Sequence, residues 1–152
     1  MTEIEFHTNV QNKLAFSCRL LRKAYRSGVR AVVIAEPPML AELDELLWSF
    51  SATDFLPHCR VTEGGQRVAL SPVLLAATPL GCPVNSVLVN LGQTMPEGFE
   101  RFDRFLEVIS DADRLPGRER WKKYLELGYK LTQHNAQTET LEKPEKSEKT
   151  SA

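Results

Sequence analysis

The 152-residue sequence predicts an α/β fold, in which a largely parallel β-sheet is flanked by helices. Short apolar segments rich in β-branched residues alternate along the chain with longer segments whose apolar residues recur every three or four positions. The apolar segments are nearly continuous, which is typical of strands that are buried on both faces of a parallel sheet. Right-handed crossovers are expected between such strands.

The first strand is predicted over residues 3–8, where Ile4 and Phe6 alternate with polar neighbours. Asn9 or Asn12 can cap the helix that follows, and Gly28 stands where a glycine commonly ends a helix. These residues therefore form one strand followed by one helix.

A second unit begins with VRAVVIAE, residues 29–36, a β-branched run that predicts a buried strand. Pro37 and Pro38 can begin the next helix, because the first turn of a helix does not need their missing N–H groups. The apolar stripe of this helix consists of Leu40, Leu43, Leu47 and Trp48.

Residues 67–79 and 85–92 are further strand candidates, and Pro72 leaves open whether the first is one strand or two. In GFERFDRFLEVIS, residues 98–110, the apolar side chains recur at helical spacing, which predicts a helix. A last helix is predicted over residues 118–131. Residues 1–131 then form a single domain, and the polar, Lys- and Glu-rich residues 132–152 form a disordered tail.

The net charge is close to zero, because the chain has 19 basic and 20 acidic residues. This balance excludes a global attraction of the whole molecule to nucleic acid or to an acidic membrane. Cys18, Cys59 and Cys82 are widely spaced and form no Cys-x-x-Cys pair, which argues against disulfides and a zinc site and for a reducing compartment. The N-terminal residues lack the pattern of a signal peptide. The expected location is the cytoplasm.

The sequence offers no residues for nucleotide chemistry, because the turns after the first two strands, TNVQNK and AEPPML, contain no glycine that could bring backbone N–H groups to a phosphate. His7, His58 and His134 are scattered, and the context of His58 is more typical of a histidine that holds a loop than of a catalytic one. No catalytic, cofactor-binding or metal-ligating residue is expected.

Two surfaces are candidates for binding. Several aromatic residues cluster around the end of the helix that contains Trp48. For Trp48 and for Phe55 the sequence favours a core position and an interface position equally, whereas Phe50 is expected in the core. On the last helix, Arg118, Trp121 and Lys122 share one side, which suits a ligand that is both anionic and apolar, such as the terminal carboxylate of a peptide. A solvated helix face or a stacking surface for single-stranded nucleic acid are the alternatives.

Five segments of the chain, in this order and spacing, resemble the chi subunit of bacterial DNA polymerase III: YRSGVRAVVIAE (25–36), LDELLWSFSATDFLPH (43–58), VLVNLG (87–92), FDRFLEVIS (102–110) and RERWKKYLELGY (118–129). The resemblance covers residues 1–131. It implies a Rossmann-like fold without a nucleotide-binding glycine loop and a non-catalytic adaptor that needs no cofactor. It also implies a monomer or a 1:1 heterodimer that contacts DNA only indirectly.

In this family, one surface binds the psi subunit and so links chi to the clamp loader. By the resemblance, Trp48 and Phe55 contact psi, and Pro57 and His58 shape the loop that presents them.

A second surface of the family captures the acidic, Phe-terminated tail of single-stranded DNA-binding protein. Arg118 and Lys122 match the cations that receive its carboxylates, and Trp121 stands where tyrosine is frequent. Ile109 and Ala112 are candidates for the apolar wall of the tail pocket. The rival functions are a nucleotide-binding enzyme domain that uses His58 at the carboxyl edge of the sheet, and a module that binds single-stranded DNA directly.

Overall fold

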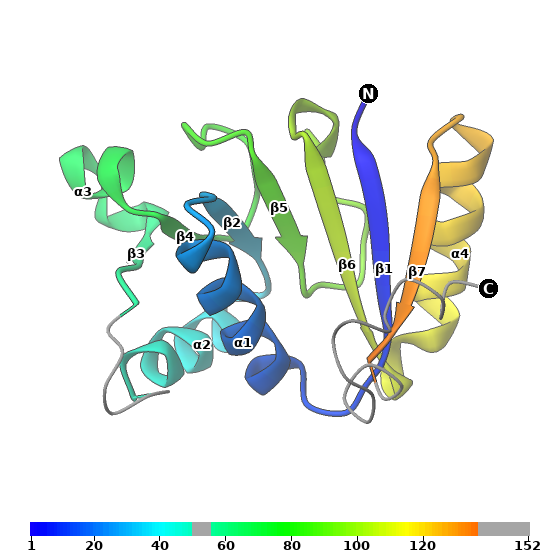
Figure 1. Cartoon of the computed structure of the whole chain (residues 1–152), viewed down its shortest axis with the longest axis horizontal. Helices are drawn as coiled ribbons and strands as arrows, with labels where there is room; N and C mark the ends of the chain where they lie inside the picture. The colour runs from blue at the N-terminus through cyan, green and yellow to red at the C-terminus, as the bar shows by residue number, and fades with distance from the viewer. Residues whose placement is uncertain (50–55, 137–152) are drawn as a thin grey trace.

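The computed structural model describes residues 1–49 and 56–136, and within them the α/β prediction is confirmed (Figure 1). Seven parallel strands form one sheet in the order β3-β4-β2-β5-β6-β1-β7. The strands are β1 (Glu3–Val10), β2 (Ala31–Ile34), β3 (Cys59–Arg60), β4 (Val73–Ala76), β5 (Val87–Asn90), β6 (Arg104–Ser110) and β7 (Leu131–Asn135). The α-helices are α1 (Lys13–Arg26), α2 (Pro37–Ser49), α3 (Gly65–Leu70) and α4 (Arg114–Glu126). Three short 3₁₀ helices are η1 (Val61–Glu63), η2 (Phe99–Arg101) and η3 (Asp111–Asp113).

Helices cover both faces of the sheet. Helices α1 and α2 pack on one face with side chains such as Val33 and Val89, whereas α4 packs on the other face with side chains such as Val32 and Leu88. The middle strands are therefore buried on both sides, which explains why their sequences are continuously apolar.

Helix α1 follows the predicted signals closely. Asn12 is its N-cap, and the Asn12 side chain accepts a hydrogen bond from the backbone N–H of Ala15 at 3.0 Å. After the helix, Gly28 takes a φ of +77°, a left-handed conformation that other residues rarely adopt.

The helix expected over residues 98–110 is wrong. Only Phe99–Arg101 forms a 3₁₀ turn, and Arg104–Ser110 is strand β6 between β5 and β1. The consecutive residues 105–109 are all buried, as in a central parallel strand. The spacing of Phe99, Phe102, Phe105 and Leu106 predicts the helix, but Phe105 and Leu106 pack on opposite faces of the sheet, as neighbours in a strand do.

The segment 67–79 holds a single strand. Residues up to Leu70 belong to α3, and Pro72 stands directly before β4, where a strand does not need its N–H group. The short edge strand β3 is an addition to the predicted strands.

The sheet continues past residue 131, the expected end of the domain, because β7 pairs with β1 from Leu131 to Asn135. His134 therefore lies in the sheet and not in the polar tail. Residues 137–152 lie outside the described part of the chain.

The three cysteines are free and buried, as expected of small apolar side chains. Burial raises the pKa of Cys18 to about 11, which suppresses the thiolate. None of the helices in the described part of the chain combines the length and apolar composition that a membrane span requires.

Candidate functional site

Helix α4 carries the three residues predicted to bind an anionic, apolar peptide end. Arg118 and Lys122 are exposed, and Trp121 is half-buried. The buried residues of α4 are Gly117, Arg120 and Tyr124, and Trp121 packs against the edge of the same core. The two predicted cations therefore lie on the solvent side of the helix, and Trp121 lies at the border between solvent and core.

A groove with a volume of about 390 Å³ runs beside α4. Its lining residues are Phe6, Thr8, Asn9, Ile109, Arg114, Gly117, Arg118, Trp121 and Gln133. Arg118 and Trp121 thus line one groove, whereas Lys122 is exposed on the same helix and is not among the lining residues. Arg114 adds a second guanidinium, one helical turn before Arg118.

The apolar part of the groove lining comes from Phe6, Ile109 and Trp121. The Phe6 ring of β1 meets the Trp121 ring edge-on, with centroids 4.9 Å apart and an interplanar angle of 72°. Ile109, expected in the apolar wall, is buried and lines the groove, whereas Ala112 is exposed in η3 and is not among the lining residues.

Gly117 brings α4 close to β6. A Cβ atom at Gly117 would lie only 3.1 Å from Cδ1 and 3.2 Å from Cγ2 of Ile109. Glycine at this position therefore permits a helix–strand approach that a larger residue would disturb.

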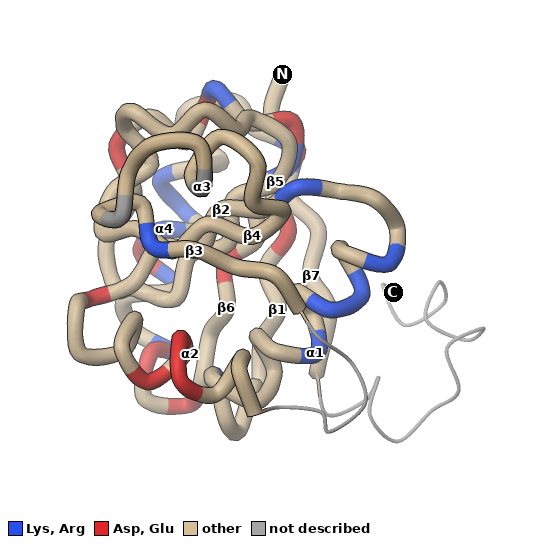
Figure 2. The backbone as a smooth tube through the Cα atoms, turned by 90° about the vertical axis from the view of Figure 1, so that its left-hand side faces the viewer, with Lys and Arg blue, Asp and Glu red and all other residues tan. Residues whose placement is uncertain are grey.

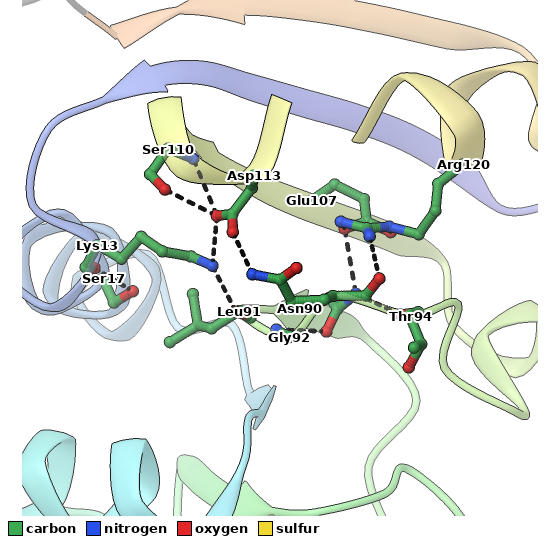
Figure 3. Close-up of polar contacts among 11 residues, drawn as sticks. Lys13, Ser17, Asn90, Leu91, Gly92, Thr94, Glu107, Ser110, Asp113 and Arg120 are labelled. Atoms are coloured by element: carbon green, nitrogen blue, oxygen red, sulfur yellow. Dashed lines mark hydrogen bonds and ion pairs between the residues drawn. The ribbon is translucent and has the colours of Figure 1, made fainter. Parts of the chain in front are cut away.

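A buried polar network holds α4 on the sheet (Figure 3). Arg120 donates two hydrogen bonds to the carboxylate of Glu107, through Nε at 3.0 Å and Nη2 at 2.9 Å. The same carboxylate accepts hydrogen bonds from the Tyr124 hydroxyl at 2.6 Å and from Asn90 Nδ2 at 3.1 Å. Burial raises the pKa of Glu107, while Arg120, Tyr124 and Asn90 oppose that rise.

A second group of contacts fixes the start of α4. Lys13 Nζ lies 2.7 Å from the Asp113 carboxylate, which also accepts hydrogen bonds from the backbone N–H and the hydroxyl of Ser110 (Figure 3). Burial acts to raise the pKa of Asp113, but Lys13 and Ser110 outweigh it and lower that pKa. The beginnings of α1 and α4 are thereby joined at the carboxyl ends of β1 and β6.

The second predicted surface lies at the end of α2. Trp48 is 55% exposed, and its ring lies 4.7 Å from the His58 ring, tilted by 54°. Pro57 is half-buried, whereas Phe55 and Phe50 lie outside the described residues. Figure 2 shows that acidic residues gather on α2; they are Glu42, Asp44 and Glu45.

His58 holds the loop that enters β3. Its side chain is buried, with Nδ1 2.8 Å from the Leu56 carbonyl oxygen and Nε2 2.8 Å from Asp44 Oδ1. His58 directly precedes β3, so it lies at the amino ends of the strands. This position is opposite to the carboxyl edge on which the rival enzyme reading depends.

A second pocket at the carboxyl edge, away from the groove beside α4, suits phosphate poorly. It has a volume of about 200 Å³ beyond the ends of β2, β4 and β5, and its lining includes Glu36 and Glu97 but no Lys or Arg from the described residues. Two carboxylates without a cation repel a polyphosphate.

The comparisons with known proteins agree with the motif-based resemblance. The family model described as "DNA polymerase III chi subunit, HolC" matches residues 1–132. The DNA polymerase III subunit chi of Pseudomonas aeruginosa is 31% identical over 144 residues, which cover 88% of this chain and 96% of that protein. The corresponding subunit of Haemophilus influenzae is 28% identical over 125 residues, with 78% and 84% covered. That of Escherichia coli is 29% identical over 118 residues, with 75% and 79% covered. The chain therefore belongs to the DNA polymerase III chi subunit family.

Proposed function

We propose that this protein is a non-catalytic accessory subunit of the DNA polymerase III holoenzyme. It binds the acidic C-terminal tail of single-stranded DNA-binding protein in the groove beside α4, and it joins the clamp loader through psi at the α2 surface. The adaptor role requires no cofactor, and the protein acts in the bacterial cytoplasm as a monomer or in a 1:1 heterodimer with psi.

The observation that carries the tail proposal is the composition of the groove. Arg114 and Arg118 provide two guanidinium groups that suit carboxylates, and Phe6, Ile109 and Trp121 provide an apolar surface for an aromatic side chain. A peptide that ends in a phenylalanine after several aspartates offers both chemistries at one end. Lys122, exposed one turn after Arg118, adds attraction for the aspartates that precede the terminus.

The arrangement of the two surfaces supports a protein that binds two partners at once. The α4 groove lies at the carboxyl ends of β1 and β6, whereas Trp48 and His58 lie near the amino end of β3, which is the strand at the other side of the sheet. Figure 1 shows α2 and α4 on opposite sides of the molecule. Neither partner would have to displace the other.

A calorimetric titration with an acidic, Phe-terminated peptide tests the tail site. Micromolar affinity is expected for so small a site, about −8 kcal/mol, and added salt should weaken binding without abolishing it. Arg118→Ala and Trp121→Ala should each weaken binding at least about tenfold, because each removes one of the two required chemistries. Lys123→Ala is the matched control, since Lys123 is an exposed cation of α4 outside the groove. Equal affinity in all four proteins would refute the tail site.

The psi surface is tested by co-purification of psi with Trp48→Ala and Arg118→Ala variants. Trp48→Ala should lose psi and keep the tail peptide, and Arg118→Ala should do the opposite. A single variant that loses both partners while remaining folded would contradict the separation of the two surfaces.

The rival functions predict different ligands. Single-stranded DNA would need a continuous basic surface, but Arg120 is buried against Glu107 and is not available to a phosphate backbone. Saturable binding of an oligonucleotide that Lys122→Ala abolishes would favour direct DNA binding, and saturable thermal stabilisation by a nucleotide would favour an enzyme.

A further inference from the structure

Three side chains with metal-binding atoms meet where β1 and β7 pair. Glu5 and His7 stand two residues apart on β1 and so face the same side of the sheet, and His134 pairs with His7 across the two strands. One ligand atom from each residue lies within 4.8 Å of the others. The sequence gives no hint of this cluster, because 127 positions separate the two histidines and His134 lies in a polar segment.

The distances suit a small divalent ion. Glu5 Oε1 lies 3.4 Å from His7 Nε2 and 3.7 Å from His134 Nε2. Ligand atoms arranged tetrahedrally at about 2.1 Å from Zn²⁺ are about 3.4 Å from each other. The two imidazole rings stack, with centroids 4.9 Å apart and planes inclined by only 16°, so both rings lie beside the Glu5 carboxylate and would turn towards each other to share an ion.

His7 is the strongest indication that something is bound here. The residue is 8% exposed; Nδ1 has no hydrogen-bond partner among the described residues, and Nε2 has only the 3.4 Å contact with Glu5 Oε1, which is too poorly aligned for a hydrogen bond. Buried polar atoms without partners are rare because desolvating them costs free energy that nothing returns. A metal ion coordinated by one of these nitrogens would compensate that cost.

Glu5 is oriented for the same purpose. Arg104 donates hydrogen bonds to Oε2 of Glu5 at 2.7 and 3.1 Å, which leaves Oε1 directed at the two histidines. An outer residue that orients a carboxylate ligand in this way is common at metal sites. The side chains of Glu5 and His134 are 17% and 34% exposed, so an ion can reach the cluster from solvent.

We propose that Glu5, His7 and His134 form a site for a divalent transition-metal ion, with Zn²⁺ as the probe. One carboxylate and two imidazoles are a ligand set that Zn²⁺ accepts, and a water molecule can complete the coordination. The ion would fasten the edge strand β7 to β1. Gln133 of β7 lines the groove beside α4, so the site lies on the strand that borders the proposed peptide site.

The test uses the full chain without an affinity tag, after treatment with a chelator and its removal. Calorimetric titration with Zn²⁺ should show one site per chain. Glu5→Gln and His134→Asn should each weaken Zn²⁺ binding at least about tenfold, since each removes one ligand. Glu3→Gln is the matched control, because Glu3 is an exposed carboxylate on the same strand and side of the sheet.

Thermal unfolding provides a second readout that does not depend on any protein partner. Zn²⁺ should raise the Tm of the parent and of Glu3→Gln by several degrees, because the ligands come together only in the folded chain, and it should not do so for the two ligand variants. The proposal fails if the parent releases no heat with Zn²⁺, or if either ligand variant binds Zn²⁺ as the parent does.

Discussion

Arg120 of α4 and Glu107 of β6 form a buried ion pair with two parallel hydrogen bonds of 2.9 and 3.0 Å, both groups being less than 10% exposed. The pair connects the helix that lines the groove to a central strand of the sheet. Neither residue lines the groove, so the pair sets where the helix lies without touching a ligand in it.

Arg120→Met should lower the free energy of unfolding by about 3–5 kcal/mol, because it leaves the Glu107 carboxylate buried without its cation. The double variant Glu107→Gln/Arg120→Met should lose less than the sum of the single variants, since no uncompensated charge remains. Urea unfolding followed by circular dichroism measures both, with Arg118→Ala as the control that stays within about 0.5 kcal/mol of the parent. Additive losses would contradict the coupling.

Gly117→Ala should destabilise the protein by about 1 kcal/mol and weaken peptide binding severalfold. The added methyl group would meet Ile109 at 3.1 Å and push α4 outwards, a cost of about 1–3 kcal/mol that the higher helix propensity of alanine offsets by about 1 kcal/mol. Ile109→Val, which removes the nearest atom, should reduce the effect of Gly117→Ala. Denaturant melts and the peptide titration test this, and an unchanged affinity would mean that the groove tolerates the shift.

Stability should fall in acid partly through Glu5. Burial acts to raise the pKa of Glu5, but His7 and Arg104 outweigh it and lower the pKa from its ordinary 4.5 to about 2. Because the folded pKa is the lower one, this contribution is complete above pH 4.5 and is lost as the pH falls from 4.5 towards 2. In the presence of a chelator, the free energy of unfolding of Glu5→Gln should depend less on pH in this window than that of the parent. Parallel pH profiles would show that Glu5 is not the group responsible.

Asn12→Ala should lower the free energy of unfolding by about 1 kcal/mol, because α1 loses the side chain that accepts a hydrogen bond from the backbone N–H of Ala15. Gln11→Ala, an exposed neighbour outside the helix, is the control. Thermal or urea unfolding of the three proteins gives the answer, and an unchanged Asn12→Ala variant would mean that solvent replaces the cap at no cost.

The α/β architecture was predictable because the strands β2, β4 and β5 are short apolar runs that only a doubly covered sheet can bury. The prediction failed where a strand imitated helical spacing or an exposed edge changed the pattern. Phe105 and Leu106 of β6 continue a helical spacing in the sequence, although they pack on opposite faces of the sheet. Strand β7 is an edge strand with mainly polar residues, so neither its alternation nor its composition distinguishes it from a tail.

Only those residues of the candidate site that lie on the single helix α4 were predictable from the sequence. Arg118 and Trp121 follow from helical spacing, and the structure places them in one groove. Phe6 joins them because β1 lies beside β6 and β7, a relationship that depends on strand order and that no local pattern encodes.

The strand order also decides how the molecule would respond to force. Seven strands at about 4.8 Å spacing separate β3 from β7 by roughly 29 Å. A pull between partners held at the two sides would run across the strands, so it would stretch the hydrogen-bonded ladders one after another and not all at once. The ion pair between Arg120 and Glu107 adds a direct connection from α4 to β6 beside the ladders that join β6, β1 and β7.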